Sequence, residues 1–393
     1  MLRGAVSWPD DKTIFESIDT GPYIDGNVEI RLKNKLYFSN WASLDTDYEF
    51  ILLGGDTYEL GQTIETLFPA FSNLLFIGFE DDRRFMDLTK TIHRGEDYVL
   101  YHRLDRFFLT LRPEWGILTI GRQAITWGNG LLFNPMDLFN PFSPTDIERN
   151  YKVGDDMVVG QFPIDPLVDL QLLYVPRRNL VSDEVQWDQS SLAGKLHLTL
   201  ETTDFDVMAA SHYSDAIIGL GNSGYIGDAA WRLDGVWTFL DDDTRRDGFL
   251  SLVANLDYSW VWRHKNFYGM LEFYYNGLGQ DDYSMALLDP DILERRMRGE
   301  IFTLGRAYLG GHLKIELHPL FNFHLTLINN LADPSGIIQP RATWNITQNL
   351  ELLLGAEVYY GDEGTEYGGF EIPGTSLLLK APARVTLRLA YFF

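Results

Sequence analysis

Residues 249–262 read FLSLVANLDYSWVW, a stretch in which apolar and polar side chains alternate. Its apolar positions are Leu250, Leu252, Ala254, Leu256, Tyr258, Trp260 and Trp262. Its polar positions are Ser251, Asn255, Asp257 and Ser259. Because successive side chains of a strand point to opposite faces, a period of two predicts a β-strand with one apolar and one polar face. The stretch exceeds the roughly 9–11 residues that a tilted strand needs to cross a bilayer.

The same alternation recurs along the chain. In residues 26–38 the apolar side chains are Val28, Ile30, Leu32, Leu36 and Phe38, and the polar ones are Glu29, Arg31, Lys33 and Lys35. Similar stretches are residues 167–175, 192–201, 309–318, 320–330, 337–346 and 349–360. A soluble β-sandwich alternates in the same way, so this pattern alone leaves both fold classes open.

The lengths of the connections favour a transmembrane barrel. In outer-membrane barrels, tight periplasmic turns alternate with long outer loops along the chain. The short connections are residues 112–114, 163–166, 201–204, 227–228, 263–266, 318–319 and 347–349. Between them lie the longer loops, near residues 124–153, 176–191, 277–303 and 361–378. We therefore predict short periplasmic turns and long extracellular loops.

Aromatic residues gather at the ends of the expected strands, where amphipathic rings meet the boundary between membrane and water. The predicted periplasmic girdle consists of Trp260, Trp262, Phe267, Phe321, Phe323 and Trp344. The predicted outer girdle consists of Trp237, Phe239, Tyr275 and Tyr360. The alternative, packing in a soluble core, fits less well because these residues sit beside turns.

Composition excludes several classes of protein. The chain of 393 residues carries a formal charge of -24, which argues against binding a nucleic-acid backbone. No window approaches the 18 or so unbroken apolar residues of a membrane helix. With no cysteine, the chain has no disulfide, Cys-ligated metal or covalently attached haem of its own. The start, MLRGAVS, has no apolar signal core, and we interpret it as a mature exported sequence with an added Met instead of a cytosolic one.

The C-terminus ends in a perfectly alternating strand. The apolar positions Val385, Leu387, Leu389 and Tyr391 lead to a terminal aromatic, Phe393. This end resembles the C-terminal assembly signal of Gram-negative outer-membrane barrels, in which Leu387, Leu389, Tyr391 and Phe393 would be read by the barrel assembly machinery. The resemblance implies a location in the outer membrane, in contact with lipid and lipopolysaccharide.

The predicted fold is all-β, a single transmembrane antiparallel β-barrel over residues 1–393. We count about seventeen strands, and because bacterial barrels have even numbers, sixteen or eighteen stay open, with eighteen preferred. Residues 1–25 are expected to form a periplasmic segment or the first strand. Residues 56–97 are expected to form a plug or a long loop.

One local cluster stands out, GRQAITWGNG at residues 121–130, followed by Asn134-Pro135 and Asn140-Pro141. A long ordered loop of this kind usually has a function. We expect residues 124–153 either to fold into the lumen as a constriction, with Arg122 and Asp137 facing the pathway, or to form a surface loop. The run resembles a segment of uncharacterised proteobacterial outer-membrane barrels and, more distantly, of alginate-export porins, which implies a pore or export barrel. The many lumenal arginines that an alginate pathway requires are missing.

Enzyme motifs are weak. The run from Gly219 to Gly224 matches a dinucleotide-binding pattern, but strand-like alternation follows it where a helix is required. The histidines lie singly, and Ser211 beside His212 is the only pair that suggests a hydrolase. Acidic runs such as Asp241–Asp243 are expected to be solvated surface more often than cation sites. We therefore predict no enzyme, cofactor or metal site.

The lumen is expected to carry both signs of charge, which predicts weak ion selectivity, slightly in favour of cations because of the acidic loops. The predicted pore-lining residues are Arg122, Asp137, Arg31, Lys33, Glu29, Arg232, Asp234, Lys314, Glu316, Arg341, Glu357, Arg384 and Arg388. The leading hypothesis is an outer-membrane pore for small polar solutes or for export. The alternatives are a sleeve around a partner, such as a multihaem cytochrome or an envelope transporter component, and an outer-membrane hydrolase.

Overall fold

The computed structural model describes residues 1–67, 79–139, 141, 143–144, 151–241 and 246–393. Within these residues, eighteen antiparallel strands form a closed β-barrel, which confirms the predicted fold and the preferred strand number. The strands are β1 (Leu2–Trp8), β2 (Tyr23–Ser39), β3 (Ala42–Gly55), β5 (Tyr98–Leu111), β6 (Ile117–Gln123), β7 (Asp155–Asp165), β8 (Val168–Val175), β9 (Ser191–Leu200), β10 (Thr203–His212), β11 (Asp215–Ile226), β12 (Ala229–Phe239), β13 (Gly248–Trp262), β14 (Lys265–Asn276), β15 (Ala307–His318), β16 (Phe321–Asn330), β17 (Gly336–Thr347), β18 (Leu350–Tyr360) and β21 (Ala383–Tyr391).

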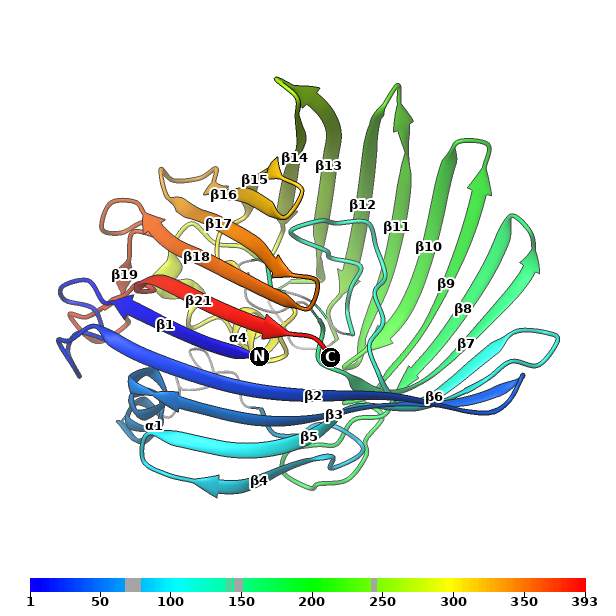
Figure 1. The fold of residues 1–393 in the computed structure, drawn as a ribbon, viewed down its shortest axis with the longest axis horizontal. Helices are drawn as coiled ribbons and strands as arrows, with labels where there is room; N and C mark the ends of the chain where they lie inside the picture. Colours follow the sequence, from blue (N-terminus) through cyan, green and yellow to red (C-terminus); the bar gives the residue numbers. More distant parts are fainter. Residues whose placement is uncertain (68–78, 140, 142, 145–150, 242–245) are drawn as a thin grey trace.

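The first and last strands close the ring. Leu2 of β1 lies opposite Val28 of β2 on one side and opposite Leu389 of β21 on the other. Both chain termini therefore meet at one end of the barrel (Figure 1). Residues 1–25 thus contain the first strand. Residues 56–97 contain helix α1 (Asp56–Leu67) and strand β4 (Thr89–Arg94), which pairs with one half of β5, and their stretch 68–78 lies outside the described residues.

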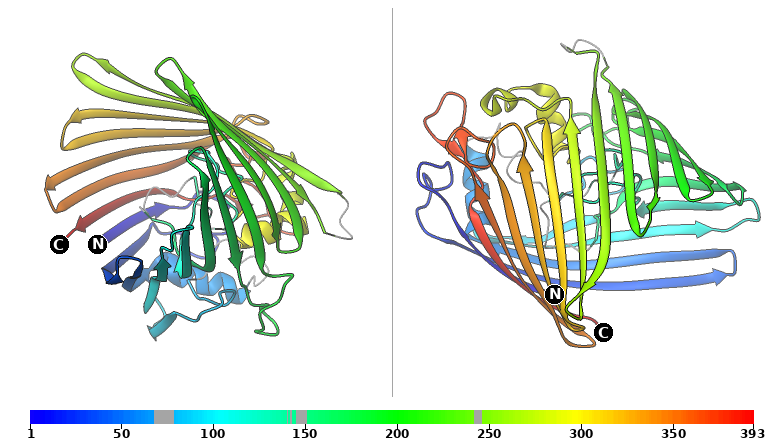
Figure 2. Two further views of the ribbon diagram at one scale, coloured as in Figure 1. Left: turned by 90° about the vertical axis from the view of Figure 1, so that its right-hand side faces the viewer. Right: turned by 90° about the horizontal axis from the view of Figure 1, so that it is seen from above.

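The two ends of the barrel differ. Tight turns and both termini occupy one end, which we call the short-turn end. The other, the long-loop end, carries helices α1, α3 (Tyr283–Ala286) and α4 (Pro290–Met297) and the small hairpin of β19 (Phe370–Glu371) and β20 (Leu378–Leu379). Figure 2 shows α1 and α4 away from the two termini. Short connections at 213–214 and 331–335 are exceptions to the long-loop pattern.

The alternation in sequence places apolar side chains on the outside of the ring. On β2, Ile30 and Leu32 are 50% and 47% exposed, whereas Arg31 between them points inward to other charged residues. The expected aromatic girdles include exposed rings at both ends, among them Trp262, Trp344 and Trp237. No helix among the described residues is long and apolar enough to span a membrane.

Candidate functional site in the barrel lumen

The described residues of the loop between β6 and β7 fold into the ring. We call residues 124–154 the constriction loop. Its Trp127 is 1% exposed and packs, with Met136, against the inward-facing Met208 and Val236 of the wall. Farther along, Phe133 stacks on Tyr274 of β14, with ring centroids 4.4 Å apart. The described part of the loop therefore crosses the lumen from one wall toward another instead of lying on the surface.

Two wall carboxylates hold the backbone of this loop. Glu272 of β14 accepts hydrogen bonds from the backbone N–H groups of Leu131 (2.7 Å), Leu132 (3.0 Å) and Phe133 (2.7 Å). Asp234 of β12 accepts bonds from the backbone N–H of Asn129 (2.5 Å) and from its side-chain amide (2.7 Å). Hydrogen bonds to a charged acceptor are the stronger kind, so five such contacts fix the loop in one position.

Asp137 lies inside the constriction loop and pairs with Lys152 of the same loop. Its side chain is almost fully buried. Burial raises the pKa of Asp137 to about 7, although the neighbouring Lys152 opposes the shift. Asp137 was expected to face the pathway; instead it closes an internal contact of the loop.

Arg122 is also enclosed. Its guanidinium donates to Asp156 of β7 (2.8 Å) and to Asp81 (2.8 Å), and its exposed fraction is 1%. Burial alone would raise the pKa of Asp81, but Arg84 and Arg122 together lower it below its ordinary value. Arg122 therefore fastens residues 81–86 to the wall and presents no surface to a solute path.

Most of the other predicted lumen charges lie on the inner wall and are already engaged. Arg31 bonds to Glu49 (2.5 Å), Asp105 (2.7 Å) and Asp47 (2.8 Å), and Glu29 accepts a bond from the Tyr151 hydroxyl (2.9 Å). The remaining contacts join Arg232 to Asp257, Arg388 to Glu351, Arg384 to Asp25, and Gln339 to Glu357. The structure thus places these residues in several wall networks instead of one site.

Sequence reasoning missed the acids around Arg31. Asp47 and Glu49 alternate with Thr46 and Tyr48 along β3, so the period-two signal was present in residues 45–49. No alternating pattern marks Asp81 in the sequence, because Asp81 lies in a loop and its partner Arg122 is distant in the sequence.

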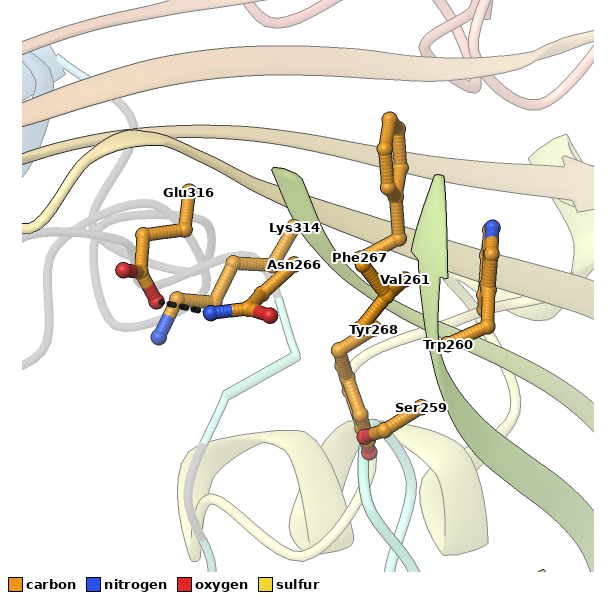
Figure 3. Close-up of a pocket in the computed structure, with 8 residues that line it drawn as sticks. All are labelled: Ser259, Trp260, Val261, Asn266, Phe267, Tyr268, Lys314 and Glu316. Atoms are coloured by element: carbon orange, nitrogen blue, oxygen red, sulfur yellow. Dashed lines mark hydrogen bonds between the residues drawn. The ribbon is translucent and has the colours of Figure 1, made fainter. Parts of the chain in front are cut away.

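A cavity of about 350 Å³ opens on the wall near the turn between β13 and β14. Figure 3 shows the side chains around it, including the hydrogen bond from the Asn266 amide to Glu316 (3.1 Å). Lys314, predicted to line the pore, lies beside this pair. The lining residues are Ser259, Trp260, Val261, Asn266, Phe267, Tyr268, Lys314 and Glu316.

A second polar network lies at the long-loop end. His212 of β10 contacts the Ser191 hydroxyl through Nδ1 (2.7 Å) and Glu300 through Nε2 (3.0 Å). Ser191 is 1% exposed and also bonds to the Arg177 guanidinium (2.8 Å), so its hydroxyl has no surface for a substrate. Ser211 is not the partner of His212. These contacts join the segment that carries α3 and α4 to the barrel wall.

Comparison with known proteins identifies the fold. No family model matches the sequence, and no curated protein matches it. Solved structures that match it almost end to end include three with TM-scores above 0.5. They are Wzi of Escherichia coli, a carbohydrate-binding outer-membrane β-barrel involved in group 1 capsule assembly (TM-score 0.53, 8% identity, covering 100% of this chain and 84% of that one), OccAB3 of Acinetobacter baumannii (0.54, 9%, 100% and 98%), and a BenF-like porin of Pseudomonas fluorescens Pf-5 (0.54, 8%, 100% and 96%).

Proposed function

We propose that this chain, which has the fold of outer-membrane β-barrel porins, is a passive pore for small polar solutes in the outer membrane of a Gram-negative bacterium. The observation that carries the proposal is the constriction loop, which enters the ring and is bound there by Glu272 and Asp234 of the wall. A loop fixed in this way narrows the lumen to a constant cross-section. Passage then follows the gradient of the solute, so the same pore serves uptake and export.

The orientation follows from the two ends. In the proposal the short-turn end and both termini face the periplasm, and the long-loop end faces outward, as in other outer-membrane barrels. The apolar outer face contacts lipid, and the outer loops contact lipopolysaccharide. The barrel assembly machinery is the proposed reader of the C-terminal strand β21.

The charges of the lumen support weak selectivity among small ions. Strong selectivity needs a ring of one sign at a narrow point. Here Arg31, Arg232 and Arg388 each pair with wall carboxylates, so much of the field cancels locally. The excess of acidic residues in the loops adds a slight preference for cations.

The test is single-channel conductance of the refolded protein in a planar bilayer, with the reversal potential measured under a salt gradient. We expect small, steady steps with weak selectivity. Glu272→Gln removes the charge that three loop N–H groups share, so we expect larger or noisier steps. Glu316→Gln is the matched control, because this wall glutamate contacts Asn266 and not the loop.

A second candidate is the sleeve around a partner protein. It is favoured by the dense packing of the long-loop half, where Phe249, Leu278, Ile292 and Phe370 form one buried cluster. A correctly folded barrel that stays silent in the bilayer, together with its Glu272→Gln variant, would overturn the open pore and support this candidate. Any covalently attached haem would then belong to the partner, because the chain has no cysteine for such attachment.

A further inference from the structure

Strand β2 has one edge that is only partly covered by a neighbouring strand. On one side, β3 pairs with it from Asp25 to Ser39. On the other side, β1 pairs with it only from Tyr23 to Val28. Figure 1 shows β2 and β3 continuing past both termini to the tip of their hairpin, and the view from above in Figure 2 agrees. No described strand pairs with the rest of this edge, residues 30–39, which we call the free edge.

The direction of the backbone groups on the free edge follows from the last residue pair before it. The amino terminus of Met1 donates to the Glu29 carbonyl (2.6 Å), and the Glu29 N–H donates to the Met1 carbonyl (2.9 Å). In an antiparallel ladder, the N–H and C=O groups of every second residue point to the same side. The residues of the free edge whose backbone groups point to the side without a strand are therefore Arg31, Lys33, Lys35 and Tyr37.

A membrane barrel restricts where such an edge can lie. Unpaired N–H and C=O groups do not occur in contact with hydrocarbon, because no water is there to bond with them. The free edge therefore lies at or beyond the boundary between membrane and water. Residues 32–40 are all exposed, whereas Ala42 and Ser43 at the start of β3 are buried. The free edge is thus an accessible surface with unused capacity for hydrogen bonds.

The face of the free edge that continues the lumen wall is basic. Lys33 lies directly opposite Asp47 of β3, but Asp47 pairs with Arg31 at 2.8 Å. Within the described ranges, no carboxylate pairs with the Lys33 ammonium group. Lys35 has one partly exposed partner, Asp45, at 3.1 Å. In a chain with a net charge of -24, this face is a local reversal of sign.

A second copy of this chain does not fit the free edge. When two such edges pair antiparallel, residues whose backbone groups point outward from each edge lie opposite one another. In the registers with the largest overlap, Lys33 and Lys35 of one copy then face cations of the other copy. Like charges directly opposite destabilise a strand pair, and lysines on an edge prevent identical edges from joining. The free edge is therefore suited to a strand of opposite charge.

We propose that the free edge binds an extended segment of a partner protein, which pairs with β2 as an additional strand. The segment carries acidic side chains on the face of Lys33 and Lys35. On its other face it carries apolar side chains, because Leu32, Leu36 and Phe38 of the outer face are 47%, 46% and 64% exposed. Backbone hydrogen bonds supply the affinity, and the alternating side chains supply the specificity. The periplasmic location of this partner rests on the proposed function, whereas the strand pairing does not depend on an open pore.

The test uses a fluorescent peptide of about ten residues, alternating valine and glutamate, which matches the length of the free edge. Its binding to the folded, detergent-solubilised barrel is measured by fluorescence anisotropy at low salt. We expect this peptide to bind. The matching valine–lysine peptide should bind at least about tenfold more weakly, and so should a valine–glutamate peptide whose central valines are replaced by proline, which cannot continue a ladder. Equal binding of the three peptides, or a barrel that forms dimers through this edge, would overturn the proposal.

Amide hydrogen exchange locates the binding. In the barrel without peptide, the N–H groups of Lys33 and Lys35 should exchange much faster than those of Leu32 and Asn34, which point toward β3. The valine–glutamate peptide should slow the exchange of Lys33 and Lys35. Protection of these two amides before any peptide is added would mean that the edge is already covered, which contradicts the proposal.

Variants separate charge from backbone pairing. Lys33→Glu should weaken binding of the valine–glutamate peptide by about fivefold or more and strengthen that of the valine–lysine peptide. Tyr37→Pro removes one N–H of the free edge, keeps both lysines, and should also weaken binding by about fivefold. Lys90→Glu, which changes an exposed lysine of β4, should change binding less than about twofold. If Tyr37→Pro fails to fold, unchanged binding in Lys33→Glu would still contradict the proposal. Anisotropy needs no ion flow, so a barrel that conducts nothing in a bilayer leaves this result interpretable.

Discussion

At the scale of single residues, the lumen is organised by carboxylates that hold backbone amides and guanidinium groups. Glu272 holds three consecutive N–H groups of the constriction loop, an arrangement in which a carboxylate replaces the water that these donors would otherwise bind. Asp137 is the opposite case. It is buried beside one cation, Lys152, and its Oδ1 makes no hydrogen bond. The effect of burial on the pKa of Asp137 is therefore larger than the opposite effect of Lys152.

The pKa of Asp137 predicts how stability depends on pH. Because burial raises it to about 7, above the ordinary 3.8, the folded protein holds a proton between these values that the unfolded chain has released. The free energy of unfolding should therefore fall as pH rises through this window, by at most about 1.4 kcal/mol per pH unit. Urea unfolding followed by tryptophan fluorescence from roughly pH 4 to pH 8, a range that covers nearly all of this window, measures the slope.

The comparison that isolates this effect is between the wild type and Asp137→Asn. The variant has no proton to release at this position, so its slope should be shallower than that of the wild type. Asp188→Asn, which changes an exposed aspartate, should keep the slope of the wild type. An unchanged slope in Asp137→Asn would show that this carboxyl is not the titrating group.

At the scale of elements, the segment with α3 and α4 is held to the wall by buried charges. Arg295 of α4 pairs with Asp215 at the start of β11, and both side chains are largely buried. Glu300 reaches His212 of the neighbouring strand. Apolar packing of Leu278 and Ile292 adds to these contacts. Because the Arg295–Asp215 ion pair and the hydrogen bond between Glu300 and His212 join one segment to one pair of strands, they act together as a clasp at the long-loop end.

We expect Arg295→Met to release this clasp. Removing one partner of a buried pair leaves Asp215 with an uncompensated charge, which costs about 3–5 kcal/mol. Amide hydrogen exchange should therefore accelerate across residues 283–297, while the strands of the ring keep their protection. Arg178→Met is the control, because its partner Asp183 is 78% exposed and a surface pair of this kind contributes about 0–1 kcal/mol. Equal exchange in the two variants would mean that the packing alone holds the segment.

The strands were predictable from sequence and their internal contacts were not. Each wall strand has one apolar outer face and one polar inner face, so apolar and polar residues alternate in its sequence, as in residues 249–262. The constriction loop shows the opposite: Leu131 and its acceptor Glu272 are 141 residues apart, and nothing near either residue indicates the other. For the same reason Arg122 looked like an exposed pore residue, since its neutralising partner Asp81 comes from another loop.

At the scale of the whole molecule, the ring of strands is closed by the pairing of the N-terminal strand β1 with the C-terminal strand β21. The short strand β1 has hydrogen-bonding neighbours on both sides only when β21 is in place, because β1 pairs with β2 on one side and with β21 on the other. The strand β21 thus has two roles in the proposal, as a wall strand in the folded barrel and as the segment read during assembly. The terminal Phe393 allows these two roles to be tested separately, because its side chain lies beyond the strand and is 89% exposed.

Phe393→Ser should therefore affect assembly and not the finished barrel. The side chain has few contacts to lose, so the variant refolded in detergent should unfold within about 0.5 kcal/mol of the wild type. In cells, the amount of barrel in the outer membrane should drop severalfold if the assembly machinery reads this aromatic. Phe38→Ser, which removes an outward aromatic that is 64% exposed at the end of β2, controls for the loss of an exposed ring. Equal loss of both variants from the membrane would assign the effect to lipid contact and refute a signal at the C-terminus.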